Sequence, residues 1–311
     1  MNIGILMTAT AQSGDMAEYA RKVESLGFDS LWIPEHPVIP VGHKTPFPIG
    51  DGKLPDHYNR WADPFIALTV AATVTTQLKL GTAICLLPER EPLMTAKVIA
   101  SLDLYSGGRV IIGAGAGWLR EETEVMGTSF RLRWKRMREM VEAMRVLWTQ
   151  AEASYEGETV RFPAVRCEPK PVQKNGPPIL LGAHGPKALE RVARTYDGWL
   201  PLVHNPEHFK TDLAELRRLA RDRGRNPDAL QCTIIVEPSQ EGPSTDELKR
   251  YRDAGAERVI VFSQRMGSEI ADGSGVPGFR SGWSIGAMGL PFSSVRTVIP
   301  SASVSTCCVY L

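Results

Sequence analysis

Short apolar segments alternate with longer amphipathic segments along most of this chain, and that alternation restricts the fold more than any other feature. It is typical of a parallel sheet, whose consecutive strands are joined by crossover helices. We expect eight strands, over residues 3–7, 30–34, 79–84, 110–113, 178–182, 198–202, 232–236 and 258–262. We expect helices between them, over residues 16–26, 65–75, 95–105, 134–148, 186–196, 206–223 and 245–254.

Eight strands with intervening helices predict an α/β fold of the (β/α)8 or TIM barrel type rather than a doubly wound open sheet. A length of 311 residues is normal for one such barrel. The catalytic groups of these barrels lie at the C-terminal ends of the strands, so chemistry is expected in the loops that follow strands. The long loop after the second strand, residues 35–63, is therefore the expected substrate lid.

Several residues support these boundaries. Gly27 follows the first helix and suits a left-handed C-terminal position, while Pro186 and Pro206 suit the first positions of helices. Residues 153–161 are expected to form a small hairpin. One set of apolar residues recurs at helical spacing and is expected to pack against the barrel: Met137, Met140, Val141, Met144, Leu147 and Trp148.

The charge composition excludes some classes of partner. The chain has 36 basic and 35 acidic residues, a net charge of +1, so nothing attracts it to nucleic acid or an anionic membrane. No segment reaches the roughly 18 apolar residues that a membrane span needs, and the N-terminus lacks the basic region of a signal peptide. The five cysteines have no metal-ligand spacing. We expect a reduced, cytoplasmic protein without a metal site.

The first candidate for chemistry lies at the end of the second strand. His36 follows this strand directly, beside Glu35, where a barrel places catalytic groups. A neutral imidazole can donate or accept a proton near pH 7.

A second candidate is the segment of residues 80–122, which predicts strand, helix, strand and then the glycine-rich loop Gly113–Trp118. Small residues there let a flat ligand approach the backbone. A dinucleotide fingerprint is excluded because the spacing is G-x-G-x-G rather than G-x-G-x-x-G. The loop also follows the fourth strand, not an N-terminal strand.

A third candidate is the turn of Gly182, Ala183 and His184, which leads directly into a helix. Amides at a helix N-terminus bind anions, so this turn is expected to hold a phosphate, with Gly198 on the next strand nearby. No nucleophile elbow, P-loop or paired-carboxylate pattern is present, and the acidic residues are expected mostly on solvated helix faces.

Taken in order, these segments resemble the luciferase-like monooxygenase superfamily, specifically its coenzyme F420-dependent branch. The matching stretches are GFDSLWIPEH (27–36), residues 80–109, GAGAGWLREE (113–122), residues 169–201 and GRNPDAL (224–230). The resemblance implies a TIM barrel, usually dimeric, with F420 or FMN bound across the C-terminal mouth of the barrel.

The resemblance also implies roles for individual residues. His36 matches the histidine beside the deazaflavin ring, with Glu35 as its acidic neighbour. The remaining matches are to cofactor-binding positions: Ala83 and Ile84, where a non-proline cis bond is common, Gly115, Ala116 and Gly117 along the side chain, and Gly182, Ala183 and His184 at the phosphate. Two departures are Trp118, where some relatives have a catalytic glutamate, and Ala183-His184, where many have Gly-Ser.

After Phe262 the pattern breaks. The expected domain division is a barrel over residues 1–263 and a Ser/Gly-rich tail over 264–311, partly disordered, in place of the last helix. We hypothesise that a shifted reading frame or another foreign sequence produced this tail.

The leading functional prediction is an F420-dependent oxidoreductase that transfers hydride between the deazaflavin and a small organic substrate. The first alternative is an FMN-dependent monooxygenase that receives reduced flavin from a partner reductase. The second is a cofactor-binding protein without turnover. The expected assembly is a homodimer, with an F420 or flavin reductase supplying reduced cofactor.

Overall fold

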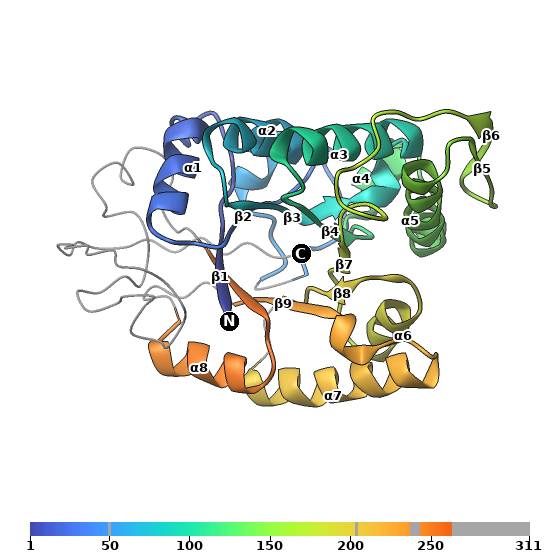
Figure 1. Ribbon diagram of the computed structural model, residues 1–311. Coiled ribbons are helices and arrows are strands. Elements are labelled where there is room, and N and C mark those ends of the chain that lie inside the picture. Colours follow the sequence, from blue (N-terminus) through green and yellow to red (C-terminus); the bar gives the residue numbers. More distant parts are fainter. Residues whose placement is uncertain (49–50, 203–204, 237–242, 263–311) are drawn as a thin grey trace.

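The computed structural model describes residues 1–48, 51–202, 205–236 and 243–262. Within these ranges, eight parallel strands close into a barrel in the order β1-β10-β9-β8-β7-β4-β3-β2 (Figure 1). This confirms the predicted (β/α)8 barrel. The barrel strands are β1 (Asn2–Leu6), β2 (Ser30–Ile33), β3 (Lys79–Leu86), β4 (Val110–Gly115), β7 (Ile179–Leu181), β8 (Gly198–Trp199), β9 (Gln231–Ile235) and β10 (Arg258–Phe262).

The helices surround the barrel, with α2 and α3 on one side and α7 and α8 on the opposite side (Figure 1). They are α1 (Met16–Ser25), α2 (Pro64–Val74), α3 (Pro92–Ser106), α4 (Arg120–Val125), α5 (Arg133–Thr149), α6 (Pro186–Thr195), α7 (Pro206–Asp222) and α8 (Thr245–Asp253). Most predicted boundaries differ from these by only a residue or two.

Three predictions on the elements need correction. Helix α4 was not predicted, because six residues are too few to produce a readable period. Helix α3 begins at Pro92 rather than residue 95, since proline is tolerated in the first turn of a helix. Strand β8 has only two residues, and beyond it a single bridge joins Leu202 to Ile235.

Other local predictions are confirmed. Gly27 has a φ of +82° after α1, and Pro186 and Pro206 open α6 and α7. The hairpin consists of the antiparallel strands β5 (Ala153–Glu156) and β6 (Arg161–Val165). The tail over 264–311 lies outside the described residues. No helix in the described ranges has the length and apolarity that a membrane crossing requires.

The interior of the barrel is filled around Trp32 of β2, whose side chain is fully buried. The neighbouring strands make room for the indole with glycines. A β-carbon on Gly4 would lie 2.7 Å from Trp32 Nε1, and one on Gly81 would overlap the indole ring. The indole N–H donates to Ser30 Oγ at 2.8 Å, so its polar atom is satisfied inside the barrel.

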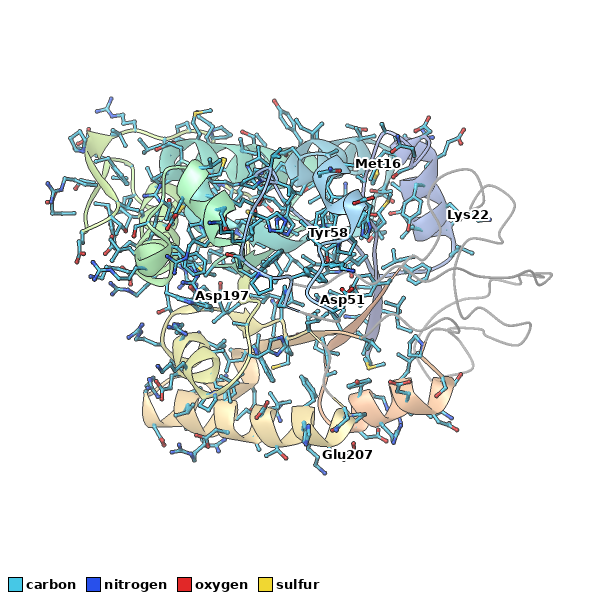
Figure 2. All side chains as sticks on the ribbon, turned by 180° about the vertical axis from the view of Figure 1, so that it is seen from behind. Met16, Lys22, Asp51, Tyr58, Asp197 and Glu207 are labelled. Atoms are coloured by element: carbon cyan, nitrogen blue, oxygen red, sulfur yellow. The ribbon has the colours of Figure 1, made fainter. Side chains whose placement is uncertain are left out.

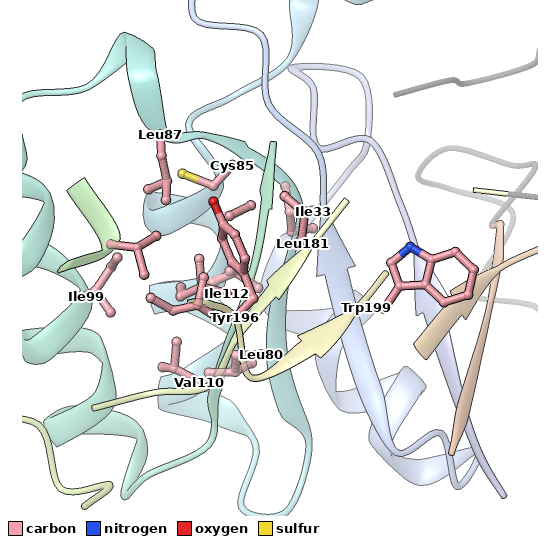
Figure 3. Close-up of a cluster of buried hydrophobic side chains, with 14 of the residues drawn as sticks. Ile33, Leu80, Cys85, Leu87, Ile99, Val110, Ile112, Leu181, Tyr196 and Trp199 are labelled. Carbon is pink, nitrogen blue, oxygen red and sulfur yellow. The ribbon is translucent and has the colours of Figure 1, made fainter. Parts of the chain in front are cut away.

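A second apolar layer lies between the strands and the helices, and Figure 3 shows part of it. It contains the predicted stripe on α5, where Met137, Met140, Val141, Met144 and Leu147 are fully buried and Trp148 is 4% exposed. The expectation that this stripe packs in the core is confirmed.

Arg109, the residue before β4, ties two helix ends to the barrel. Its guanidinium donates to the carbonyls of Ala72 and Thr75 at the end of α2, to Leu78 O and to Ser106 O. It also donates to Thr75 Oγ1 at 2.9 Å. The residue is 8% exposed, so these carbonyls have little access to water.

We predict that Arg109→Ala lowers the free energy of unfolding by roughly 3 kcal/mol, because several buried carbonyls lose their donor. Urea denaturation followed by circular dichroism measures this change. The exposed Arg221 of α7 provides the matched control, and Arg221→Ala should change the free energy by less than about 0.5 kcal/mol. Equal effects of the two substitutions would contradict the assignment.

Candidate active site

A cavity of about 260 Å³ opens at the C-terminal ends of the barrel strands. It is lined by nine of the eleven residues that the sequence predicts for the site: Glu35, His36, Ile84, Gly115, Ala116, Gly117, Gly182, Ala183 and His184. Ala83 and Gly198 do not line it. The barrel therefore brings together segments that are far apart in the sequence.

The floor of the cavity is formed by Ile84 and two glycines. A β-carbon on Gly115 would lie 2.9 Å from Ile84 Cγ2, and one on Gly182 would overlap Ile84 Cδ1. The Ala83–Ile84 peptide bond is cis, as the resemblance predicts. Because the ends of β4 and β7 present backbone rather than side chains, the floor can accommodate a flat ring.

Ala83 and Gly198 occupy other places. Ala83 is fully buried and precedes Ile84 across the cis bond. Gly198 lies in β8, where a β-carbon would overlap the carbonyl oxygen of Gln231 on β9. In the next position, the Trp199 indole donates to Ala183 O at 2.9 Å and thereby supports the turn over 182–184.

His36 lies immediately after β2 and is 8% exposed. Its Nδ1 is 2.6 Å from Glu122 Oε2 on α4. The rings of Tyr58, Trp61 and Trp118 surround it, with centroids 5.3, 5.4 and 5.9 Å from the imidazole centroid. Burial lowers the pKa of His36 to about 4, so the imidazole is neutral near pH 7.

The described parts of the predicted loop, residues 35–48 and 51–63, lie at this end of the barrel. They contain a 3₁₀ helix, η1 (Asp56–Arg60), and Figure 2 shows Tyr58 of this helix in the interior of the molecule. Phe47 contacts both Tyr58 and Trp118, at centroid distances of 5.3 and 5.5 Å. Glu121 of α4 accepts hydrogen bonds from the backbone N–H groups of Lys44 and Thr45. The loop is thus packed onto the site by aromatic contacts and anchored by Glu121.

Glu35, the predicted acidic neighbour, has both carboxylate oxygens engaged. Oε1 accepts from the Arg90 guanidinium, whose Nε is 2.7 Å away, and Oε2 accepts from the Leu86 N–H at 2.7 Å. Arg90 also pairs with Asp63 at 2.6 Å. The buried charge of Glu35 is therefore balanced by a cation.

Two further carboxyls are buried nearby, which corrects the expectation of solvated faces at these positions. Glu89 is 3% exposed and Glu122 is fully buried. Glu89 Oε1 accepts from the Thr123 hydroxyl at 2.8 Å, whereas Glu89 Oε2 and Glu122 Oε1 have no hydrogen-bond partner in the described part of the chain. Burial raises the pKa of each to about 8, and the neighbouring Glu122 raises that of Glu89 further. Both carboxyls are therefore protonated near pH 7.

One feature of the sequence pointed to Glu122: this residue is the last of the stretch GAGAGWLREE, which matches the family. Its burial could not be inferred, since the short helix α4 has no apolar period of its own. Glu89 lies in η2 (Leu87–Glu89), immediately after β3. His36 was identified by its position directly after a strand, and the same criterion could have identified Glu89.

Two arginines that line the cavity were also missed. Arg133 of α5 stacks on Phe130, with its Cζ 3.6 Å from the ring centroid, and Arg191 of α6 stacks on Trp134 at 4.1 Å. Neither forms an ion pair with a described carboxylate. Burial lowers the pKa of Arg133, as do Arg120 and Arg191 nearby. This positive region can hold an anionic group.

A second cavity of about 400 Å³ lies beside the first and shares Glu35, His36 and Trp61 with it. It is also lined by Glu89, Arg90 and Met94. Glu35, His36 and Trp61 therefore lie between the two cavities, and the second cavity adds the buried carboxyl of Glu89.

Comparison with known proteins agrees with this arrangement. A sequence model of the luciferase-like monooxygenase family matches residues 1–253. An uncharacterised protein of Mycobacterium tuberculosis is 37% identical over 265 residues, which cover 84% of this chain and 91% of the relative. A 5,10-methylenetetrahydromethanopterin reductase of Methanolobus tindarius is 30% identical over 227 residues, 73% of this chain and 62% of the reductase.

Solved structures show the same fold. A monooxygenase from Streptomyces bottropensis matches with a TM-score of 0.67 at 21% identity, over 86% of this chain and 93% of that one. An F420-dependent secondary alcohol dehydrogenase in complex with an F420-acetone adduct matches with a TM-score of 0.67 at 18% identity, over 84% and 92%.

We predict that stability falls as pH rises from about 5 to about 8 and that Glu89→Gln reduces this fall. Folding raises the pKa of Glu89 from 4.5 to about 8, so in this range the folded state retains a proton that the unfolded state releases. One such carboxyl contributes at most about 1.4 kcal/mol per pH unit. Urea denaturation at several pH values measures the slope.

Glu124→Gln is the control, since Glu124 lies on α4 with 51% of its side chain exposed. It should leave the slope unchanged. A Glu89→Gln protein with the slope of the unsubstituted protein would contradict a protonated Glu89.

Proposed function

The chain belongs to the luciferase-like monooxygenase family, and from that premise we propose that it is an F420-dependent oxidoreductase acting on a small organic substrate. Members of this family are oxidoreductases and monooxygenases. The observation that carries the proposal is the cavity itself, which is lined by Ile84, Gly115, Gly182 and a buried histidine, together with two arginines that form no ion pair with a described carboxylate.

The floor supports the binding of a planar ring. Gly115 and Gly182 pack directly against Ile84, and all three residues line the cavity. Ile84, Gly115 and Gly182 would hold a deazaflavin ring in the cavity that His36 also lines. The glycine-rich segment Gly115–Gly117 at the end of β4 would contact the side chain of the cofactor.

The arginines support an anionic tail. F420 carries a phosphodiester followed by carboxylates, so it requires positive charge beyond the ring. Arg191 and Arg133 would supply that charge, and the turn over 182–184 would supply backbone amides. FMN has a single terminal phosphate and would use less of this positive region.

The relatives support reduction chemistry more than oxygenation. The methanogen reductase is 30% identical, whereas the monooxygenase structure at 21% identity supports only the fold. The resemblance of residues 80–122 to the F420-dependent branch points the same way. FMN-dependent oxygenation remains the second outcome of the test below.

The bound cofactor would supply hydride chemistry, and the protein would supply orientation, dryness and a proton. His36 would donate or accept the proton at the substrate, since its Nε2 has no protein partner among the described residues while Nδ1 is held by Glu122. Glu35, held by Arg90 and the Leu86 amide, would fix the end of β2 from which His36 projects. Trp61 and Trp118 would exclude water from the reacting atoms.

The partners implied by the resemblance stay predictions. A homodimer would have an apolar surface available on α2, where Ile66 is 67% and Val70 37% exposed. A reductase would supply the reduced cofactor.

We predict that the purified protein binds F420 more tightly than FMN in a fluorescence titration. Arg191→Met should weaken F420 binding by about 10-fold or more, because one charge-assisted contact is lost. Arg194→Met is the matched control, as Arg194 lies exposed on the same helix, and it should leave the affinity unchanged.

Each other outcome has a defined meaning. Tight binding of FMN without F420 binding would replace the proposal with the flavin monooxygenase. Tight F420 binding without turnover over a panel of alcohols, ketones and enones would favour a cofactor-binding protein. Equal effects of the two arginine substitutions would contradict the placement of the anionic tail.

A further inference from the structure

The contact between His36 and Glu122 is the closest polar contact of the candidate active site histidine. Glu122 is fully buried, and its Oε2 lies 2.6 Å from His36 Nδ1. Its other oxygen, Oε1, has no hydrogen-bond partner among the residues that the structure describes. One proton must lie between Oε2 and Nδ1, and its location determines which tautomer the histidine adopts.

No described cation compensates a negative charge on Glu122. Arg90 is the nearest candidate by its place at the site, but it pairs with Glu35 and Asp63. Beyond the effect of burial, the charge of Glu35 after β2 raises the pKa of Glu122 further, whereas the backbone N–H of Val38 lowers it without reversing the effect of burial. Of the other elements at the site, η1 contributes His57 and the uncharged Tyr58, whose ring centroids are 5.0 Å apart.

Burial acts on the two partners in opposite directions. It raises the pKa of Glu122 and lowers that of His36, so the neutral form of each is favoured. A protonated Glu122 can carry its hydrogen on either oxygen, but a hydrogen on the buried Oε1 would have no acceptor among the described residues. The hydrogen is therefore placed on Oε2, from which it is donated to Nδ1. The ring proton then lies on Nε2.

We propose that Glu122 is a positioning residue that holds His36 as the Nε2–H tautomer and returns a proton to the ring when Nε2 gives its proton to the substrate. The return of a proton during turnover rests on the proposed function. The tautomer of His36 does not, because it concerns the free protein.

Protons and charge balance in this transfer, and the imidazole stays neutral throughout. The Nε2–H bond breaks and its proton goes to the substrate oxygen, while the electron pair stays on the ring. The Glu122 O–H bond breaks at the same time, and its proton forms the new Nδ1–H bond. His36 remains neutral, and the negative charge ends on the Glu122 carboxylate, which regains a proton before the next turnover.

The direct test is nitrogen-15 NMR of the imidazole in the free protein, with His36→Gln identifying the signal. We expect the Nε2–H tautomer between about pH 6 and pH 8. An Nδ1–H tautomer or an imidazolium in this range would overturn the proposal, whether or not the protein binds F420.

The relay is tested by Glu122→Gln. The amide group can still donate to Nδ1, so the tautomer and F420 affinity should persist. It cannot release a proton, and turnover should fall by about 100-fold or more. Turnover within about threefold of the unsubstituted protein would overturn the relay. Glu124→Gln on the same helix should change neither tautomer nor turnover.

Glu122→Asp covers the case in which Glu122→Gln does not fold. The shorter carboxyl retains an acidic proton, so the Nε2–H tautomer should persist and turnover should be reduced about 10-fold or less. An Nδ1–H tautomer in this variant would count against the proposal. If the unsubstituted protein shows no F420 turnover, the proposed function fails, and the tautomer still decides the role of Glu122.

Discussion

Closure of the barrel between its first and last strands is the constraint on which the site depends. Strand β1 pairs in parallel with β10 from Asn2 opposite Arg258 to Leu6 opposite Phe262. Arg258 secures this seam by an ion pair with Asp29, 2.6 Å away and preceding β2. Because all eight strands are parallel and the sheet is closed, their C-terminal ends form one rim. His36, Ile84, Gly115 and Gly182 meet there for that reason alone.

Packing inside the barrel then determines the shape of the site. Trp32 fills the interior, and the neighbouring strands accommodate it with Gly4 and Gly81. A large side chain also packs against glycines at the rim, where Ile84 occupies the space beside Gly115 and Gly182. One large side chain against two glycines yields a flat floor, since close packing leaves no room for further side chains.

The charge distribution of the site depends on whether each buried ionisable group has a partner of opposite charge. Glu35 is balanced by Arg90, whereas Glu122 and Glu89 pair with no cation in the described ranges, and burial favours their neutral forms. His36 is neutral for the same reason. Arg133 and Arg191 line the same cavity and form no ion pair with a carboxylate of the described residues. The site therefore has a neutral end suited to proton transfer and a positive end suited to an anion.

The sequence by itself determined the barrel, its element order and most of the residues around the cavity. Strand and helix periods, Pro186, Pro206 and Gly27 report local backbone geometry, and a position after a strand predicted His36. Only the tertiary structure decided the partners. Glu122 lies 86 residues from His36, and Arg133 and Arg191 lie on different helices. Whether a carboxyl is solvated or buried depends on what packs over it, and closure of the barrel sets that packing.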